Sequence, residues 1–404
     1  MSKAYKILTI LLGTAAAAFL VMLIVINPLP PDLTIVLAVI MMAMLAAAAL
    51  LFRSKRKWKR VAGIFMAALF VALLVPLSNF MVNTHLMLNR ISGAGNTAVG
   101  PAAIKADVAN EPFNIYITGI DQWAAEKGED LERSDVNMIV TVNPKTKTVL
   151  LTSIPRDTYV RLHTAKQMDK LTHTGVYGVD ETLNTVHDWL GVDLNYYVKM
   201  NFTGACAVVD AVDGIDVYTP VAFESSIGNY QYYKGWNHLY GREALYFARE
   251  RHTFDGKDSK RVENQQIVVK ALIKKLTSST ALLTHYGDIM KAAGENVQTN
   301  MSTDEMQDLV KMQIAELASW DIQTQKIEGV YDQDYVASLT QTMKFDVYRP
   351  YESSVRSCTD NIKAVMNPTK SEVLKANEKR SKSFFVNLFK KAFSKTDENE
   401  NENA

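Results

Sequence analysis

The sequence predicts an α/β protein, in which three transmembrane helices precede a layered α/β/α domain with a mixed sheet. Three nearly uncharged runs, each of about twenty residues, stand near the amino terminus. From residue 112 onward, strand patterns alternate with helix patterns, which favours helices layered around a sheet. Two strand patterns flank the short turn "PKTK", which predicts an antiparallel hairpin within that sheet. At 404 residues and 48% hydrophobic content, the chain has ample material for such a core.

The three apolar runs lie at about 7–26, 33–52 and 61–80, so residues 1–83 are predicted to form a membrane anchor. Each run has the length that a helix needs to cross about 30 Å of hydrocarbon. Three buried helices of a soluble core are the alternative, but uninterrupted runs of this length favour membrane spans. A cleaved signal peptide is the alternative for the first run. That run is too long, and "NPLPPD" follows it instead of a small-residue cleavage pattern.

The charges beside these runs predict how the anchor is oriented. The segment "RSKRKWKR" lies between the second and third runs, whereas the link between the first two carries no cation. The positive-inside rule therefore places the amino terminus and the basic segment in the cytoplasm. Three spans then place the rest of the chain outside. We expect a multi-pass protein of the cell membrane with an extracellular carboxy-terminal domain.

The elements of the predicted domain follow in order. Residues 84–111 are small and polar and predict a linker before a folded domain at 112–360. Alternating apolar residues predict strands at 113–120, 136–143, 148–154, 195–201 and 215–220. Helical periodicity predicts helices at 179–190, 203–212, 243–249, 262–276 and 306–318, the last after a capping box from Ser302 to Glu305. Residues 361–404 read as a polar tail. We expect its phenylalanine-faced, lysine-rich segment at 385–393 to lie on the outer membrane surface or against anionic polymer, and a disordered tail is the alternative.

Charged residues gather where the predicted strands begin and end. Asp121 follows the first strand, Arg133 and Asp135 stand at the start of the second, and Arg156 follows the third. Two carboxylates from adjacent strands suit magnesium, which takes one or two carboxylates together with phosphate oxygens and water. The arginines suit phosphate, because a guanidinium offers a planar fork of donors. Surface salt bridges at strand ends are the alternative.

A second basic cluster lies in "ARERHTFDGKDSKRVENQQ". Arg261 and Gln265 are four residues apart, so they share one face of a helix that begins near Ser259, where the free amides and the helix dipole favour an anion. Arg249 and Arg251 are two apart and would diverge if both were helical. To meet one ligand, the helix before them must end near Arg249 and the chain must continue extended. A solvated charge run is the alternative, and the residues alone leave both open.

Other classes of site find less support in the sequence. The seven histidines lack ligand spacing such as H-x-x-x-H, so zinc chemistry is not expected. The formal net charge is only +1, and no nucleic acid is expected as a partner. Cys206 sits in an apolar run and Cys358 in a polar segment, which favours burial of Cys206 as a small hydrophobe over a disulfide.

A series of motifs in one order resembles a known family. The motifs are "TGID", "RSDVNMIVTVNPKTKTVLLTSIPRDTYV", "KLTHTGVYG", "MNFTGACAVVDAVDGIDVYTP", "KGWNHLYGREALYFARERH" and "DSKRVENQQIVVKAL". Together they resemble the LytR-CpsA-Psr family of cell-wall glycopolymer ligases over roughly 112–276. The resemblance implies a membrane-anchored extracytoplasmic enzyme that uses magnesium. Such an enzyme moves a phosphorylated glycopolymer from a polyprenyl pyrophosphate carrier to peptidoglycan.

The resemblance also implies roles for eight residues. Asp121 and Asp135 match the family's metal-associated aspartates, and Arg133 and Arg156 match its phosphate-contacting arginines. The residues that match its pyrophosphate-binding set are Arg249, Arg251, Arg261 and Gln265. The implied reaction is attack of a peptidoglycan hydroxyl on the phosphorus nearer the polymer, for which positioning and charge neutralisation suffice. The alternatives are a non-enzymatic regulator that binds prenyl phosphate or polymer, and a lipid-linked pyrophosphate hydrolase.

Two departures from the family pattern stand out. Three spans resemble the capsule-associated branch, which usually carries an accessory domain before the catalytic one, but the linker here is too short to hold it. In "VDGI", Asp213 replaces one of two usual glycines, which leaves the conformation of that turn open. The residues do not indicate whether the polymer is capsule, teichoic acid or another glycopolymer.

Overall fold

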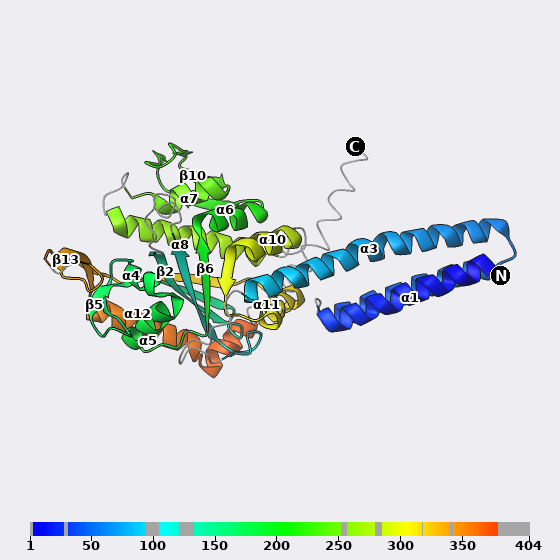
Figure 1. Ribbon diagram of the computed structural model, residues 1–404, viewed down its shortest axis with the longest axis horizontal. Coiled ribbons are helices and arrows are strands. Elements are labelled where there is room, and N and C mark those ends of the chain that lie inside the picture. The colour runs from blue at the N-terminus through cyan, green and yellow to red at the C-terminus, as the bar shows by residue number, and fades with distance from the viewer. Residues whose placement is uncertain are drawn as a thin grey trace.

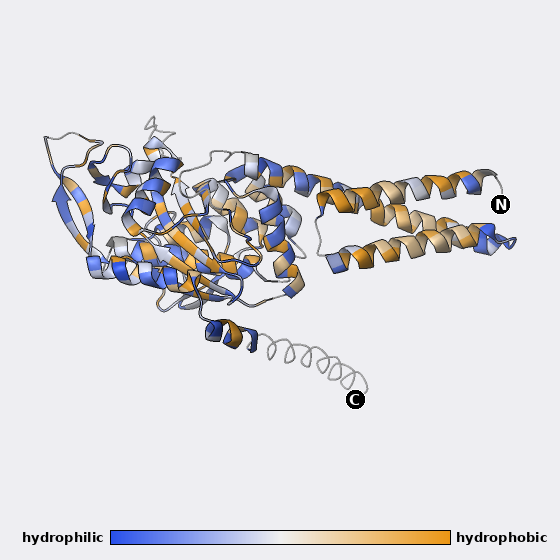
Figure 2. Cartoon of the chain, turned by 90° about the horizontal axis from the view of Figure 1, so that it is seen from below, coloured by the Kyte–Doolittle hydropathy of each residue, from blue (hydrophilic) through white to orange (hydrophobic). Residues whose placement is uncertain are grey.

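Three long apolar helices form the amino-terminal part of the protein (Figures 1 and 2). The computed structural model describes residues 3–27, 31–93, 105–120, 133–251, 257–278, 285–316, 318–339 and 342–378. The helices are α1 (Lys3–Ile26), α2 (Pro31–Arg53) and α3 (Lys57–Gly93). All three are long and apolar enough to cross a membrane, as predicted. The exposed side chains of these helices are apolar too; Ile24 is 74% exposed and Phe65 is 72% exposed. Such a surface is suited to contact with lipid and not with water.

Helix α3 is longer than its predicted span. It continues without a break from the apolar run through the first ten residues of the predicted linker and ends at Gly93. Helix α3 packs against α10 (Tyr286–Asn296), where the rings of Tyr286 and of Phe80, at the end of the predicted span, lie 5.6 Å apart. Close to its end, Thr303 Oγ1 donates a hydrogen bond of 2.8 Å to Asn89 Oδ1. Residues 84–93 are polar and have no strong helical pattern of their own, so tertiary contacts stabilise the helix there.

A six-stranded mixed sheet forms the centre of the domain, in the order β11-β6-β1-β2-β3-β12. Its strands are β1 (Phe113–Ile120), β2 (Ser134–Asn143), β3 (Thr148–Ser153), β6 (Tyr196–Asn201), β11 (Val297–Thr299) and β12 (Asp321–Lys326). Strands β1, β2 and β3 are antiparallel neighbours, so the predicted hairpin around "PKTK" is confirmed. The pairs β1·β6 and β3·β12 are parallel, which makes the sheet mixed, as predicted.

Helices cover both faces of this sheet, so the domain has the predicted α/β/α layers. On one face, Tyr116, Ile139 and Leu150 pack with side chains of α5 (Val179–Leu190) and α12 (Glu352–Met366). On the other face, Met138 and Leu151 pack with side chains of α8 (Lys257–Leu276) and α11 (Thr303–Glu316). The capping box predicted before α11 is present, because Ser302 N donates to Glu305 Oε2 at 2.7 Å and Glu305 N donates to Ser302 Oγ at 3.3 Å.

Helix α8 is shared by two cores. Its Val269 and Ile273 face the sheet, whereas its Ile267 and Leu272 pack into a second cluster. That cluster is built from helices α6 (Phe202–Ala211) and α7 (Gly241–Arg249) and strands β7 (Ile215–Thr219), β8 (Phe223–Glu224), β9 (Gln231–Tyr232) and β10 (Gly235–Leu239). The turn at "VDGI" forms despite the aspartate. Asp213 has a φ of 59°, a left-handed conformation that aspartate tolerates better than most residues.

Smaller elements complete the domain, and its last helix continues past the predicted end at residue 360. The remaining elements are β4 (Tyr159–Arg161), β5 (Met168–Lys170), α4 (Leu171–Thr174), the 3₁₀ turn η3 (Gly175–Tyr177), β13 (Gly329–Asp334) and β14 (Phe345–Pro350). Helix α12 runs through the predicted boundary to Met366, and Ile362 is buried in the core because its helical spacing from Cys358 places both on the inner face. The predicted amphipathic segment at 385–393 lies outside the described residues.

Candidate functional site: an arginine-lined pocket

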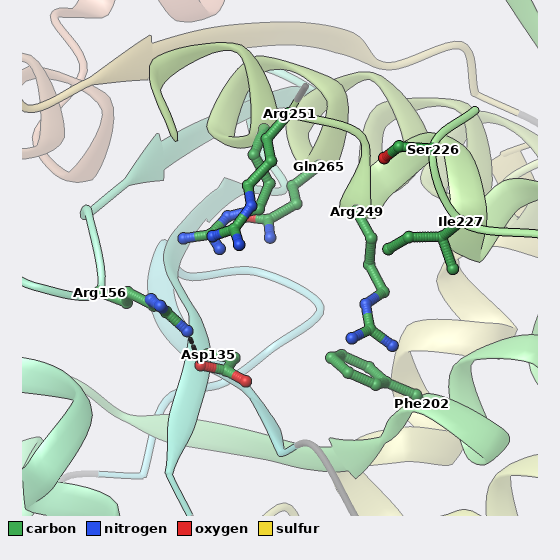
Figure 3. A pocket seen from close by; sticks show the side chains of 9 residues that line it. Asp135, Arg156, Phe202, Ser226, Ile227, Arg249, Arg251 and Gln265 are labelled. Carbon is green, nitrogen blue, oxygen red and sulfur yellow. Dashed lines mark hydrogen bonds and ion pairs between the residues drawn. The ribbon is translucent and has the colours of Figure 1, made fainter. Parts of the chain in front are cut away.

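A cavity of about 400 Å³ lies between the central sheet and helices α7 and α8 (Figure 3). Its lining residues are Asp135, Arg156, Phe202, Ser226, Ile227, Arg249, Arg251, Arg261 and Gln265. Six of the eight residues predicted from the sequence thus surround one space. Arg133 is exposed directly before β2 and does not line the cavity, and Asp121 lies outside the described residues.

One side of the pocket is formed by the start of β2 and the end of β3. Arg156 Nη1 donates a hydrogen bond of 2.7 Å to Asp135 Oδ1, and Arg156 Nε lies 3.4 Å from Asp157 Oδ2. Asp157 in turn pairs with Lys170 Nζ at 3.2 Å. The backbone is held as well, because Thr172 N donates to the carbonyl of Arg156 at 2.8 Å. Ion pairs with Asp135 and Asp157 therefore hold the Arg156 guanidinium in place.

A buried polar network supports the start of β2 beneath Asp135. Tyr116 Oη and Ser134 Oγ each donate a hydrogen bond of 2.6 Å to Asn137 Oδ1. Ser134 Oγ also lies 2.5 Å from Thr118 Oγ1. Burial raises the pKa of the Tyr116 hydroxyl well above its ordinary value, so this group stays a donor. The register between β1 and β2 shifts at Gly119, and such bulges often redirect side chains beside active sites.

The opposite side begins where α7 ends. Arg249 is the last residue of α7, and Glu250 takes the extended conformation with φ −67° and ψ 129°. The sequence predicted this change of conformation, which lets Arg249 and Arg251 face one space. The Arg249 guanidinium lies 4.7 Å from the centre of the Phe202 ring, a cation–π contact. Figure 3 shows Arg249 reaching down to Phe202 while Arg251 and Gln265 come from above.

Glu250, between the two arginines, is fully buried and holds part of the pocket wall. Its carboxylate accepts hydrogen bonds from Ser226 N at 2.5 Å and from Ser226 Oγ at 3.0 Å. The same carboxylate accepts from Arg251 N at 2.9 Å. Glu250 thus ties the turn that carries Ser226 and Ile227 to the backbone of Arg251.

The first turns of α8 bring the last two predicted residues. The helix begins at Lys257, two residues before the predicted start, and Arg261 and Gln265 reach the same cavity from one face. The amino-terminal amides and the helix dipole add to the positive potential there. Lys326, at the end of β12, donates to Ser259 Oγ at 2.8 Å and to Glu263 Oε1 at 2.9 Å, which ties this end of α8 to the sheet.

Three pocket residues were not predicted from the sequence. Phe202 follows the strand pattern at 195–201, so the rule that functional residues gather at strand ends could have found it. Ser226 and Ile227 lie in a short turn with no periodicity, and only the fold brings them beside Arg249. Within the part of the chain that the structure describes, no three His, Cys, Asp or Glu side chains gather as a metal site. Cys206 and Cys358 are both free cysteines.

Fold and pocket together define a class of protein: an α/β domain attached to three membrane-type helices, with an arginine-lined pocket suited to a polyanion. The chain belongs to the LytR-CpsA-Psr family, whose sequence pattern matches residues 85–363. This assignment agrees with the resemblance seen in the motifs.

Named relatives and solved structures agree with this assignment. The polyisoprenyl-teichoic acid–peptidoglycan teichoic acid transferase TagU of Bacillus anthracis is 37% identical over 235 residues, which cover 58% of this chain and 73% of that protein. The crystal structure of B. subtilis TagV superposes with a TM-score of 0.54 at 30% identity, covering 64% of this chain and 99% of that one. TagT bound to LIIa-WTA shares the fold, with a TM-score of 0.53 at 24% identity over 67% of this chain and 97% of that one.

Proposed function

We propose that this protein is a phosphotransferase that moves a phosphorylated glycopolymer from a polyprenyl pyrophosphate carrier to peptidoglycan. The observation that carries the proposal is the convergence of Arg156, Arg249, Arg251 and Arg261 on one cavity of about 400 Å³. A pyrophosphate is the compact anion that such a cluster of planar donors suits. The names of relatives such as TagU support a transferase that takes its polymer from a polyisoprenyl carrier.

The residues of the pocket suit this chemistry. A hydroxyl of peptidoglycan attacks the phosphorus nearer the polymer, the bond between that phosphorus and the bridging oxygen breaks, and polyprenyl phosphate leaves, while the hydroxyl proton passes to the leaving phosphate or to water. Phosphoryl transfer depends mostly on positioning and on neutralising charge on the equatorial and leaving oxygens. Arg156, fixed between Asp135 and Asp157, and the arginines from α7 and α8 supply both.

Magnesium is part of the proposal, with Asp135 as one ligand and Asp121 as the other. The donor set agrees with the ion, because a carboxylate oxygen lines the pocket beside the arginines that would hold phosphate oxygens, and magnesium prefers such oxygens. When bound, the ion would supply further neutralisation of the pyrophosphate charge. Asp135→Asn should weaken magnesium binding measured by calorimetry on the full chain with pyrophosphate present. Unchanged magnesium affinity in that variant would remove Asp135 from the metal site.

The proposed orientation follows the basic segment at 53–60, which places the amino terminus inside and the pocket outside the membrane. The names of the relatives make a teichoic acid the first donor to test. A capsular polymer, which the three spans suggested, is the second.

The test is a reconstitution of the full chain in lipid vesicles with a lipid-linked polymer, magnesium and peptidoglycan. We expect covalent polymer on peptidoglycan and release of polyprenyl phosphate. Free polymer as the only product would identify a hydrolase, and bound but unchanged lipid would identify a non-enzymatic receptor. Arg156→Ala should abolish transfer. Arg356→Ala is the matched control, because Arg356 lies on α12 outside the pocket with its side chain 73% exposed.

A further inference from the structure

The two-stranded ribbon β13–β14 stands at the end of the molecule opposite α1 and α3 (Figure 1). Its strands pair in antiparallel register from Gly329 with Pro350 to Asp334 with Phe345. Because successive residues of a strand point to opposite faces, the ribbon has two chemically different faces.

One face of the ribbon packs onto the domain. Val347 is fully buried there, and the Arg349 guanidinium lies 4.9 Å from the centre of the Tyr159 ring of β4. Arg349 Nε donates to Asp332 Oδ2 at 2.7 Å, and its other end pairs with Asp334. This face is therefore occupied by intramolecular contacts.

The other face carries four side chains in two cross-strand pairs; Tyr331, Gln333 and Asp346 are exposed, and Tyr348 is half-buried with its Oη 3.4 Å from the Ile327 carbonyl oxygen. Tyr331 lies opposite Tyr348, and their rings meet edge to face with centres 5.1 Å apart. Gln333 lies opposite Asp346, and its Nε2 donates to Asp346 Oδ1 at 2.9 Å. Tyr331 is 51% exposed. The face thus offers aromatic rings next to a planar amide and a carboxylate.

The ribbon is tied to the segment that carries Arg156. Tyr348 N donates a hydrogen bond of 2.8 Å to the carbonyl of Asp157, the residue after Arg156. The connection between the two strands is held as well, since Ser338 N donates to the buried Asp169 Oδ2 and Tyr159 Oη donates to the Tyr335 carbonyl, both at 2.8 Å. A surface held at both ends is preorganised for binding, which lowers the entropy lost on association.

The chemistry of this face fits a sugar chain. Sugar rings present apolar C–H faces that pack on tyrosine rings, and hydroxyl edges that hydrogen-bond to amides and carboxylates. The charge excludes the other polymer of the proposed reaction. Asp346 is the carboxylate on this face, and a carboxylate repels a chain of phosphates; Asp332 and Asp334 lie on the opposite face, where Arg349 neutralises them. The position continuous with the pocket segment, and farthest from the membrane helices, suits the acceptor.

We infer that the outward face formed by Tyr331, Gln333, Asp346 and Tyr348 is a docking surface for the glycan strand of the peptidoglycan acceptor. The inference rests on the proposed function and deepens it, because it assigns the acceptor a place separate from the arginine pocket.

The test is sedimentation of the full chain, in detergent, with insoluble peptidoglycan freed of attached polymer. Tyr331→Ala should weaken binding about tenfold, as expected for truncation of a central aromatic contact, and Tyr331→Phe should retain most of it. In the transfer reaction, Tyr331→Ala should raise the KM for peptidoglycan and leave the KM for the lipid donor unchanged. Trp236→Ala on β10 is the matched control, because that side chain is 70% exposed on a different ribbon.

Unchanged peptidoglycan binding by Tyr331→Ala would overturn the inference. An equal loss in Trp236→Ala would overturn it too, because any exposed aromatic residue would then suffice. If the wild-type chain binds peptidoglycan through Tyr331 and yet transfers nothing, the proposed function fails and the docking surface stands.

Discussion

The arginines from α7 and α8 depend on the shape of their side chains as much as on their charge. If Arg249, Arg251 and Arg261 share one pyrophosphate, each charged contact is worth about 1.5 to 3 kcal/mol, and a single ammonium cannot replace a fork-shaped pair of hydrogen bonds. Arg249→Lys, Arg251→Lys and Arg261→Lys should therefore each lower lipid pyrophosphate affinity and turnover strongly. Gln265→Ala should have a smaller effect, because it removes a neutral group.

Affinity, turnover and thermal melts of these variants check the prediction. The melts separate loss of the site from loss of the fold. Wild-type affinity and turnover in all three lysine variants would contradict the prediction. That result is expected if the arginines are solvated surface charges, because lysine preserves the net charge.

Glu250 acts on the ligand only through other residues. The Glu250 carboxylate accepts hydrogen bonds from Ser226 and from the backbone N–H of Arg251. In Glu250→Gln, the side-chain NH₂ group would face one of these N–H donors and could not accept its hydrogen bond. Glu250→Gln should lower lipid pyrophosphate affinity by the equivalent of about 1 to 3 kcal/mol. Ser226→Ala, which leaves the backbone donor in place, should lower it less. Binding and melts test both, and an equal effect of the two changes would argue against this role.

Among the secondary-structure elements, the regular ones were readable and the short polar ones were not. The predicted bounds of β1 and α5 match the structure to the residue, because their apolar residues recur with the period of a strand or a helix. Strands β12 and β13, "DIQTQK" and "GVYDQD", carry few apolar residues, and they form because neighbouring strands pair with them. In α12, Val355, Cys358 and Ile362 are spaced as on one face of a helix. The prediction of a polar tail from residue 361 missed this spacing.

The buried Asp169 of β5 contacts His173 of α4 and Ser338 in the connection between β13 and β14, and its charge should stabilise the fold in a defined pH range. Burial by itself would raise the pKa of Asp169, but hydrogen bonds and charge attraction from His173, with hydrogen bonds from Ser338 and from the Lys170 backbone, outweigh burial and lower it. A lowered carboxyl pKa contributes stability above about pH 4, and that stability is lost as the pH falls through the folded-state pKa. Asp169→Asn should therefore lower the Tm near pH 6.

Thermal melts of the full chain between pH 3 and pH 7 give the measurement. The difference in Tm between the wild type and Asp169→Asn should shrink below about pH 4, because the wild-type carboxyl is then protonated too. A difference that stays constant down to pH 3 would show that the ionised carboxylate is not the stabilising form.

At the scale of the whole molecule, α3 joins membrane and domain in one continuous helix that packs on α10. The proposed orientation predicts that a reporter active only outside the membrane is active when fused after residue 96 and silent when fused at Ser54. The basic segment beside Ser54 is the physical reason, since cations are retained on the cytoplasmic side. Activity at Ser54 would reverse the orientation, and with it the extracytoplasmic function.

The sequence by itself determined the three apolar helices, the α/β class and the arginine-rich character of the pocket, because apolar period, run length and residue type are local properties of the chain. It also indicated that α7 ends at Arg249, since two arginines two residues apart reach one ligand only if the helix stops between them. The tertiary structure alone decided which residues meet. Ser226 and Ile227 join the pocket through packing between segments far apart in sequence, and Arg133, exposed before β2, stays outside it. Such contacts depend on how whole elements dock, and no local pattern records them.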